Sequence, residues 1–378
     1  MLQLKEIYNQ KFFSALCQSL KKSHPKFSEK KFLALIFDNE WQKRELKQRM
    51  RHISYCLNQS LSKSYPQNIQ ILKQTAADFP QDKMSGLALV IFADYVETFG
   101  LEDFSTSIAA LEFFTEFGSA EFAIRHFLVK YEKPTLKQML LWAKSKNHHI
   151  RRLATEGCRP RLPWGIALAK YKQNPTPILP ILEILKNDQS EYVRRSVANN
   201  LNDIAKDHPK IALDLAQKWL KNADENLIKL VKHGLRGLLK KGDQRALRLF
   251  AIHGDHGGTI ELFAIKFDLQ KNLVKVGDNL EQNLSFSFRL INQKKNKIRL
   301  EYAIYFLMKN GKHSKKVFQI IEKNLDEGVF DFAKNHSLRL MTTRKYYSGK
   351  HKLALILNGV EVCVKEFDIF FSFSGLLR

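Results

Sequence analysis

The segment His149-Ile-Arg-Arg-Leu-Ala-Thr-Glu-Gly-Cys158 recurs in altered form as Tyr192-Val-Arg-Arg-Ser-Val-Ala-Asn-Asn-Leu201. The two copies lie 43 residues apart (150 to 193), and each follows a helical stretch and a short polar loop. A spacing of roughly 40–47 residues is the period of the two-helix HEAT unit. Val231-Lys232-His233-Gly234-Leu235 is a weaker third copy. We therefore predict a helical-repeat solenoid, an array that presents a concave surface to a partner.

Helical periodicity extends well beyond these copies. Up to about residue 250 the apolar side chains recur at spacings of three and four, as in Phe13, Leu16 and Leu20, and prolines punctuate the helical stretches. No alternating strand pattern occurs before residue 259. We therefore assign residues 1–254 to one helical-repeat domain.

The pattern changes in the last third of the chain. Four runs of alternating apolar residues follow a glycine-rich linker at 254–258, and two of them lead into Asn310-Gly311 and Asn358-Gly359. An Asn-Gly pair between alternating runs is a strong hairpin signal. Residues 255–378 are therefore predicted to form an immunoglobulin-like β-sandwich, without the cysteine pair of antibody domains. The fold class is mainly α, a HEAT-like solenoid followed by this sandwich.

The charge balance points to a polyanionic partner. The chain carries 62 Lys and Arg against 38 Asp and Glu, a formal net charge of +24 at pH 7. No apolar stretch approaches the roughly 20 residues of a membrane span, and residues 1–8 lack the apolar run of a signal peptide. The cysteines are scattered and read as reduced thiols: Cys17, Cys56, Cys158 and Cys363. We expect a cytoplasmic protein that binds nucleic acid, at the nucleoid of a bacterial cell.

One helix, at about residues 147–158, is expected to carry the chemistry. Its apolar residues recur at i, i+3, i+4 and i+7, which leaves Arg152 and Glu156 together on another face. In the next repeat Arg195 takes the place of Arg152, and Asp203 follows further along. Stacked repeats would align these rows into a groove lined by arginines with a few carboxylates among them.

Glu156 admits two interpretations. The first is an ordinary surface ion pair with Arg152, worth about 0.3–0.5 kcal/mol. The second is a functional acid, because a surface that binds phosphate should exclude carboxylates unless a cation must be held there. A methylated purine is such a cation, and so is the oxocarbenium sugar that forms as its glycosidic bond breaks.

Trp164 follows Pro160 and Pro163 in a stiff, basic loop. Such a ring either plugs a junction between repeats or stays partly exposed, and the residues alone leave both alternatives open. An exposed tryptophan face would be the best side-chain partner for a cation.

The segments around Glu156 and Arg195 continue as long, irregular strings. They read Arg151-Arg-Leu-Ala-Thr-Glu-Gly-Cys-Arg-Pro-Arg-Leu-Pro-Trp164 and Ser190-Glu-Tyr-Val-Arg-Arg-Ser-Val-Ala-Asn-Asn-Leu-Asn-Asp-Ile-Ala-Lys-Asp-His-Pro209. Together with Phe117-Gly-Ser-Ala-Glu-Phe-Ala-Ile-Arg125 and the appended β-domain, they resemble the AlkC branch of the HEAT-like-repeat DNA glycosylases. The resemblance covers most of the chain and is weakest over about the first 80 residues.

The resemblance implies monofunctional removal of N3-alkylated bases such as 3-methyladenine from double-stranded DNA. It implies no metal, no cofactor and no lyase step, and a damaged base that is not turned into a pocket. Because the leaving base is already cationic, its release needs no general acid. The reaction needs only stabilisation of the sugar cation and a positioned water. Carried over by position, the catalytic group is Glu121, Glu156, Asp203, Trp164 and Arg152. Glu121 rests on the resemblance alone, Trp164 would pack against the lesion, and Arg152 would hold phosphate or orient Glu156.

Basic side chains along the groove are the expected phosphate contacts: Arg125, His148, Arg151, Arg159, Arg161, Arg194, Arg195 and Lys232. The third copy departs from the Arg-Arg pattern at Lys232-His233, which leaves the far end of the groove undefined. The β-domain is expected to clamp the duplex through loops such as 294–297 and 344–347. Either loop could equally be a solvated turn.

Two other classes of protein compete with this enzyme, which we expect to act as a monomer. A non-enzymatic HEAT-type scaffold would need the phosphate-binding arginines but neither the acids nor Trp164. Membrane association through the basic surface would be favoured by an amphipathic basic helix, and the sequence contains no clear example.

Overall fold

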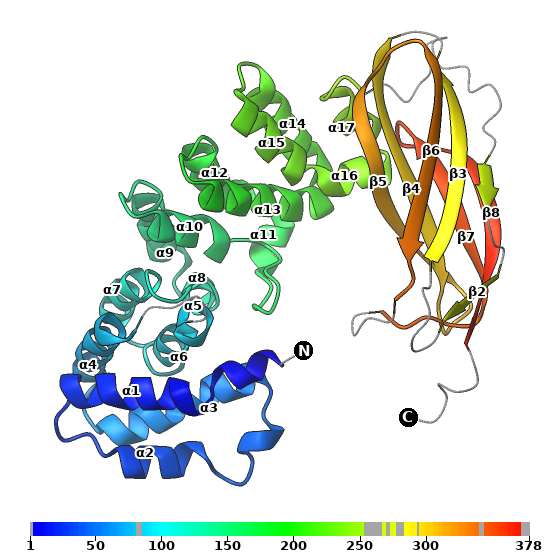
Figure 1. Cartoon of the computed structure of the whole chain (residues 1–378). Helices are drawn as coiled ribbons and strands as arrows, with labels where there is room; N and C mark the ends of the chain where they lie inside the picture. Colours follow the sequence, from blue (N-terminus) through cyan, green and yellow to red (C-terminus); the bar gives the residue numbers. More distant parts are fainter. Residues whose placement is uncertain are drawn as a thin grey trace. The chain divides into compact units, whose positions relative to one another are not determined.

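The computed structural model describes residues 3–80, 85–252, 267–269, 273–276, 283–292, 295–339 and 344–371. The chain forms two compact units, Met1–Gly234 and Leu235–Arg378 (Figure 1). The linker predicted at 254–258, and with it the predicted boundary after residue 254, lies outside the described residues.

Helices make up the described part of the first unit, as the periodicity predicts. Up to residue 130 its α-helices are α1 (Gln10–Ser23), α2 (Glu29–Ile36), α3 (Leu46–Leu61), α4 (Tyr65–Asp78), α5 (Ser85–Ala88), α6 (Val90–Phe99), α7 (Phe104–Phe114) and α8 (Ile124–Lys130). Short 3-10 turns lie at Leu4–Ile7, Trp41–Lys43 and Thr176–Ile178. Within the described ranges, no helix combines the length and apolarity that crossing a membrane requires.

The predicted repeats follow in the second half of this unit. Their helices are α9 (Glu132–Trp142), α10 (His148–Gly157), α11 (Ala169–Gln173), α12 (Leu179–Leu185), α13 (Glu191–Asp207), α14 (Pro209–Leu220) and α15 (Glu225–Gly234). Helices α10 and α13 begin at His148 and Glu191, which preserves the 43-residue spacing of the sequence copies. Helix α13 packs against both α10 and α15, so the three copies are neighbours in one stack (Figure 1).

Helix α10 has the start and the buried face that its sequence predicts. The Asn147 side chain caps it by accepting a hydrogen bond from the His149 amide at 2.8 Å. Ile150, Leu153 and Ala154 are buried, as the i, i+3, i+4 spacing requires. The last member of the stripe, Gly157, ends the helix against Ile124 of α8.

The second unit contains two helices and two sheets. Helices α16 (Arg236–Lys241) and α17 (Gln244–Arg248) precede the strands. One sheet has the order β1-β3-β6, with β1 (Phe267–Leu269), β3 (Asn283–Asn292) and β6 (Gly328–Ser337). The other has the order β2-β8-β7-β4-β5, with β2 (Leu273–Val276), β8 (Val360–Phe371), β7 (Gly349–Leu357), β4 (Asn296–Leu307) and β5 (His313–Leu325).

The two sheets enclose one hydrophobic core, which confirms the predicted sandwich. The alternating residues of β3, β4 and β7 face it: Leu284, Phe286, Phe288, Leu290, Ile298, Leu300, Tyr302, Ile304, Phe306, Leu353, Leu355 and Leu357. The Asn-Gly pairs form the predicted turns between β4 and β5 and between β7 and β8. Asn358 and Gly359 have φ values of 49° and 83°, the left-handed backbone that a two-residue hairpin turn requires.

Helices α16 and α17 are attached to this β-domain. Gly242, which ends α16 with a φ of 74°, lies against the turn at Gly359, where a Cβ would stand 2.4 Å from the Gly359 carbonyl oxygen. Lys297 of β4 donates a hydrogen bond at 3.0 Å to the carbonyl of Phe250, just after α17. The last described helices of the chain therefore belong to the same compact unit as the strands.

Gly157 is expected to tolerate no larger side chain. A Cβ there would lie 2.5 Å from Cγ2 of Ile124, a buried β-branched residue with little rotamer freedom. We expect Gly157→Ala to lower the free energy of unfolding by about 1–3 kcal/mol, the usual cost of overpacking. Urea unfolding followed by circular dichroism measures the change. Gly86→Ala is the control, because a Cβ at this exposed helical position meets nothing closer than 3.8 Å. Equal destabilisation by both substitutions would contradict the packing argument.

Candidate active site

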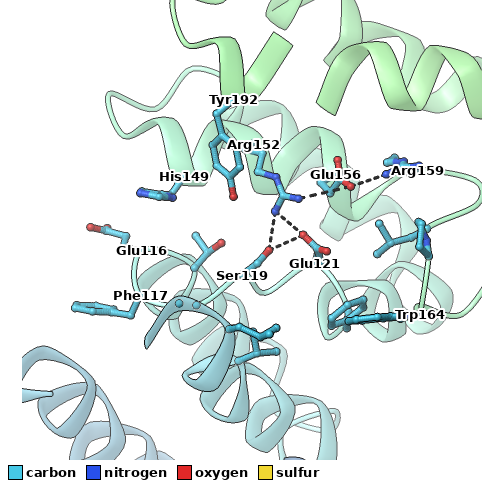
Figure 2. A pocket seen from close by; sticks show the side chains of 18 residues that line it. Glu116, Phe117, Ser119, Glu121, His149, Arg152, Glu156, Arg159, Trp164 and Tyr192 are labelled. Carbon is cyan, nitrogen blue, oxygen red and sulfur yellow. Dashed lines mark hydrogen bonds and ion pairs between the residues drawn. The ribbon is translucent and has the colours of Figure 1, made fainter. Parts of the chain in front are cut away.

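A cavity of ≈ 520 Å³ opens on the first unit beside α10. Its walls come from the start of α6, the turn that precedes α8, one face of α10, the loop after α10 and Tyr192 of α13 (Figure 2). Of the five residues predicted to be catalytic, Glu121, Arg152, Glu156 and Trp164 line this cavity.

Glu121 lies in the turn that precedes α8. Ser119 donates a hydrogen bond to its Oε2 at 2.7 Å, and Nη1 of Arg152 donates to the same oxygen. Nη1 of Arg152 also reaches the Ser119 hydroxyl at 2.9 Å, which closes a triangle of contacts (Figure 2). The carboxylate is thereby fixed at the cavity, and its side chain remains 14% exposed.

Glu156 lies deeper, on α10. Its Oε1 accepts a hydrogen bond from Nη1 of Arg159 at 2.6 Å, and its Oε2 accepts one from the Ser196 hydroxyl at 2.6 Å. The predicted i,i+4 pair with Arg152 exists, but at 3.6 Å it is the longest of these contacts. Glu156 is therefore a buried acid with several partners, and the interpretation as a simple surface ion pair is wrong.

Arg152 joins the two acids. Its guanidinium lies between Glu121 and Glu156 and 4.8 Å from the centre of the Tyr192 ring. Burial opposes the charge on Arg152, but the attraction of the two carboxylates outweighs it and raises the pKa of the guanidinium. Burial, with the neighbouring His148 and Arg152, lowers the pKa of His149, so this ring is neutral at pH 7.

Asp203 does not line the cavity. It is 1% exposed on α13, where it accepts hydrogen bonds from Nε of Arg159 and Nζ of Lys206, each at 2.9 Å. Its predicted place among the carboxylates that face the substrate is therefore corrected: Asp203 is linked to the cavity through its ion pair with Arg159, which lines it. The reason is its place on the face of α13 that packs against α10, which the repeat alignment did not show.

Trp164 is exposed, which decides between the two alternatives left open by the sequence. Its side chain is 59% exposed at the wall of the cavity and does not plug a junction between repeats (Figure 2). Its backbone has a φ of 65°, in the left-handed region that bulky residues seldom adopt.

Two of the predicted phosphate contacts are buried. Arg125 is 0% exposed and donates to the carbonyls of Gly157, Arg159 and Ile166 at 2.9, 2.7 and 2.6 Å. Burial, with the charge of Arg159, lowers the pKa of Arg125 to about 10, which leaves it protonated at pH 7. Arg159 is also buried, between Glu156 and Asp203. The phosphate role of Arg125 is corrected, because its guanidinium is fully buried. Arg159 lines the cavity, where its charge is matched by the two acids, and its contact with phosphate stays a prediction.

Arg151 and Arg194 occupy equivalent places in the two repeats and tie loops together. Arg151 forms a two-pronged ion pair with Asp188 in the loop of the next repeat, at 2.6 and 2.9 Å. Arg194 donates to the carbonyls of Asp188 and Gln189 at 2.7 and 2.8 Å. Both side chains are partly exposed, so their contact with phosphate stays a prediction beside this structural role.

The remaining predicted phosphate contacts reach the surface. His148 and Arg195 are exposed, and Lys232 is partly exposed. Arg161 is partly exposed and paired with Asp207 at 2.6 Å. Phosphate binding by these four residues stays a prediction.

The predicted DNA-contacting loops of the β-domain are only partly described. Residue 294 lies outside the described residues. In the other loop, the Arg344 guanidinium lies 4.4 Å from the centre of the Phe306 ring, and Tyr346 is buried. Tyr346 therefore packs into the sandwich and offers no exposed ring to a nucleic acid.

Four residues of the site were missed by the sequence reasoning: Ser119, His149, Tyr192 and Ser196. The repeat register could have found Tyr192, because it aligns with His149 and stacking places the two rings 5.8 Å apart. In the described parts of the chain, no group of His, Cys, Asp and Glu side chains could hold a metal ion.

Comparison with known proteins agrees with this fold. The family "Uncharacterised protein YhaZ, C-terminal Ig-like domain" matches residues 264–370. The chain is 41% identical to "Uncharacterized protein YhaZ" of Bacillus subtilis (strain 168) over 360 residues, 95% of this chain and 97% of that protein. The structure of Pseudomonas fluorescens alkylpurine DNA glycosylase AlkC, bound to DNA containing an abasic site analog, matches with a TM-score of 0.88 and 35% identity. That match covers 98% of this chain and 100% of the other, so the resemblance seen in the sequence is confirmed. The chain belongs to the AlkC-type family of HEAT-like-repeat DNA glycosylases.

Proposed function

We propose that this protein hydrolyses the N-glycosidic bond of N3-alkylated purines such as 3-methyladenine, and of other cationic methylated bases, in double-stranded DNA. The observation that carries the proposal is the pair of carboxylates, Glu121 and Glu156, held by Arg152 at a cavity with an exposed tryptophan. A strongly basic chain has little reason to keep acids at such a surface unless a cation must be stabilised there. The abasic-site analog bound by the Pseudomonas fluorescens relative supports the same chemistry.

The chemistry follows from the charge of the substrate. An N3-alkylated purine leaves as a neutral base, so the bond breaks without a general acid, and positive charge develops on the sugar. Carboxylates fixed next to that charge lower the barrier, because they are already oriented when the charge appears. Glu121 is the more accessible of the two acids and is the group that faces the sugar cation or its attacking water. Glu156 lies deeper and orients Arg152 and Arg159 through its ion pairs with them.

Arg152 holds the two carboxylates in place without contacting all of their oxygen atoms. Its contacts use one oxygen of Glu121 and a longer approach to Glu156. The second oxygen of Glu121 is thus available to a water or to the sugar. Trp164 would meet the damaged base from the other wall of the cavity, where the face of its indole ring attracts a cation. The base need not leave the duplex for these contacts to form.

The partner is double-stranded DNA, bound by a monomer in the cytoplasm. The net charge of +24 supports a large electrostatic contribution to binding. Binding of this kind weakens steeply with added salt, because phosphate contacts release counterions.

Base release separates this enzyme from a DNA-binding scaffold. We expect the protein to release 3-methyladenine from methylated DNA in the presence of a chelator, with chromatography of the free bases as the measurement. A scaffold would retain the DNA and release nothing. Loss of activity with the chelator would show instead that a metal takes part.

Substitution of Glu121 tests the catalytic assignment. We expect Glu121→Gln to lower kcat for base release about 10²–10³-fold, roughly 2.7–4 kcal/mol, because one charge-stabilising group is lost. DNA affinity should be unchanged or higher, since a negative charge leaves a DNA-binding surface.

Glu116→Gln is the matched control, because Glu116 lines the same cavity and is exposed (Figure 2). It removes the same charge near the DNA without touching Arg152. Equal losses of kcat in the two variants, or full activity of Glu121→Gln combined with Glu156→Gln, would refute the assignment.

A further inference from the structure

The backbone of Trp164 is held in an unfavourable conformation. A φ of 65° is uncommon for a residue with a bulky side chain and persists only where the surroundings impose it. The ring cannot impose it by packing, because most of its surface is exposed. The constraint must therefore act on the main chain of the loop that carries the ring.

One constraint comes from the interior. Nη1 of Arg125 binds the carbonyls of Gly157 and Arg159, before Trp164, and its Nε binds the carbonyl of Ile166, after it. A single buried guanidinium thus joins both ends of the loop. The Gly157 carbonyl lies at the C-terminus of α10, whose dipole favours a cation.

A second constraint comes from α3, more than a hundred residues earlier in the chain. Nζ of Lys47 donates a hydrogen bond at 2.8 Å to the carbonyl oxygen of Trp164 itself. The same ammonium lies 5.0 Å from the centre of the Phe122 ring, next to Glu121. Lys47 therefore connects the backbone of Trp164 to the turn that bears the catalytic acid.

We propose that Lys47 and Arg125, here called the Trp164 anchor, are positioning residues for base release. They hold the indole ring out at the cavity before DNA arrives, so that no loop has to be ordered on binding. Preorganisation of this kind lowers the entropic cost of reaching the reactive geometry. The catalytic part of the proposal rests on the proposed function, whereas the effect of the anchor on Trp164 does not.

A competing interpretation is that Lys47 binds a DNA phosphate, because it is an exposed cation on a basic protein. A phosphate contact would lose affinity on substitution and would lower the slope of log K against log salt by about one. A positioning residue would lower kcat, and its substitution would change affinity and slope no more than substitution of an exposed lysine elsewhere on the protein. The two interpretations therefore predict changes in different quantities from the same variant, affinity and salt slope for a phosphate contact and kcat for a positioning residue.

Fluorine NMR of the protein labelled with 5-fluorotryptophan reports on the anchor directly. The chain has four tryptophans, and the three others, Trp41, Trp142 and Trp219, are buried. The resonance that disappears in Trp164→Phe identifies the exposed ring. We expect one sharp Trp164 resonance in the wild-type protein, and a shifted or broadened one in Lys47→Met and in Arg125→Lys.

The variants that change the Trp164 resonance should also release the base more slowly. We expect Lys47→Met to lower kcat about tenfold to hundredfold, as for a misplaced group near the reacting atoms, with no greater loss of DNA affinity than Lys63→Met shows. Lys47→Arg, which keeps a cationic donor, should restore both kcat and the resonance. Arg125→Lys should also lower kcat, and it replaces the more disruptive Arg125→Met, which could fail to fold. Lys63→Met is the control, an exposed lysine just beyond the end of α3.

An unchanged Trp164 resonance in Lys47→Met and Arg125→Lys would overturn the proposal. Reduced affinity and salt slope in Lys47→Met, with an unchanged resonance, would make Lys47 a phosphate contact instead. If the wild-type protein releases no base from methylated DNA, the proposed function fails, and the fluorine signal still decides whether the anchor exists.

Discussion

The candidate active site depends on one arginine that forms ion pairs with two carboxylates. Arg152 on α10 binds Glu121 in the turn before α8 and approaches Glu156 on its own helix. From Glu156 the contacts continue through Arg159 to Asp203 on α13. Acid and base alternate along this row, so each buried charge has an opposite neighbour. Without Arg152, the carboxylates of Glu121 and Glu156 would lose the one side chain that contacts both of them.

This arrangement explains why a protein so rich in lysine and arginine keeps acids at a DNA-binding surface. A buried ion pair seldom adds much stability, because desolvation consumes most of the attraction. The row of charges is therefore better understood as an arrangement that fixes the positions of the carboxylates. In the proposed reaction, the acids are already in place when positive charge appears on the sugar in the transition state.

Much of the architecture could be predicted from the sequence, and the site only in part. The 43-residue spacing predicted where α10 and α13 begin, and the Asn-Gly pairs predicted two hairpin turns, because both rest on local periodicity and backbone preference. Glu121 could not be found in this way, since it lies in an irregular turn with no period. The error over Arg125 has another origin: a guanidinium that binds only backbone carbonyls leaves no complementary acid in the sequence to reveal it.

The attachment of α16 and α17 to the sandwich changes where the polypeptide can be divided. The compact units meet between Gly234 and Leu235, within what the sequence presents as continuous helix and before any change of pattern. A β-domain expressed from residue 255 would lack the partner of its Gly359 turn and would expose the surface that Gly242 covers. A division of the chain into two separately expressed pieces should therefore cut ahead of Leu235.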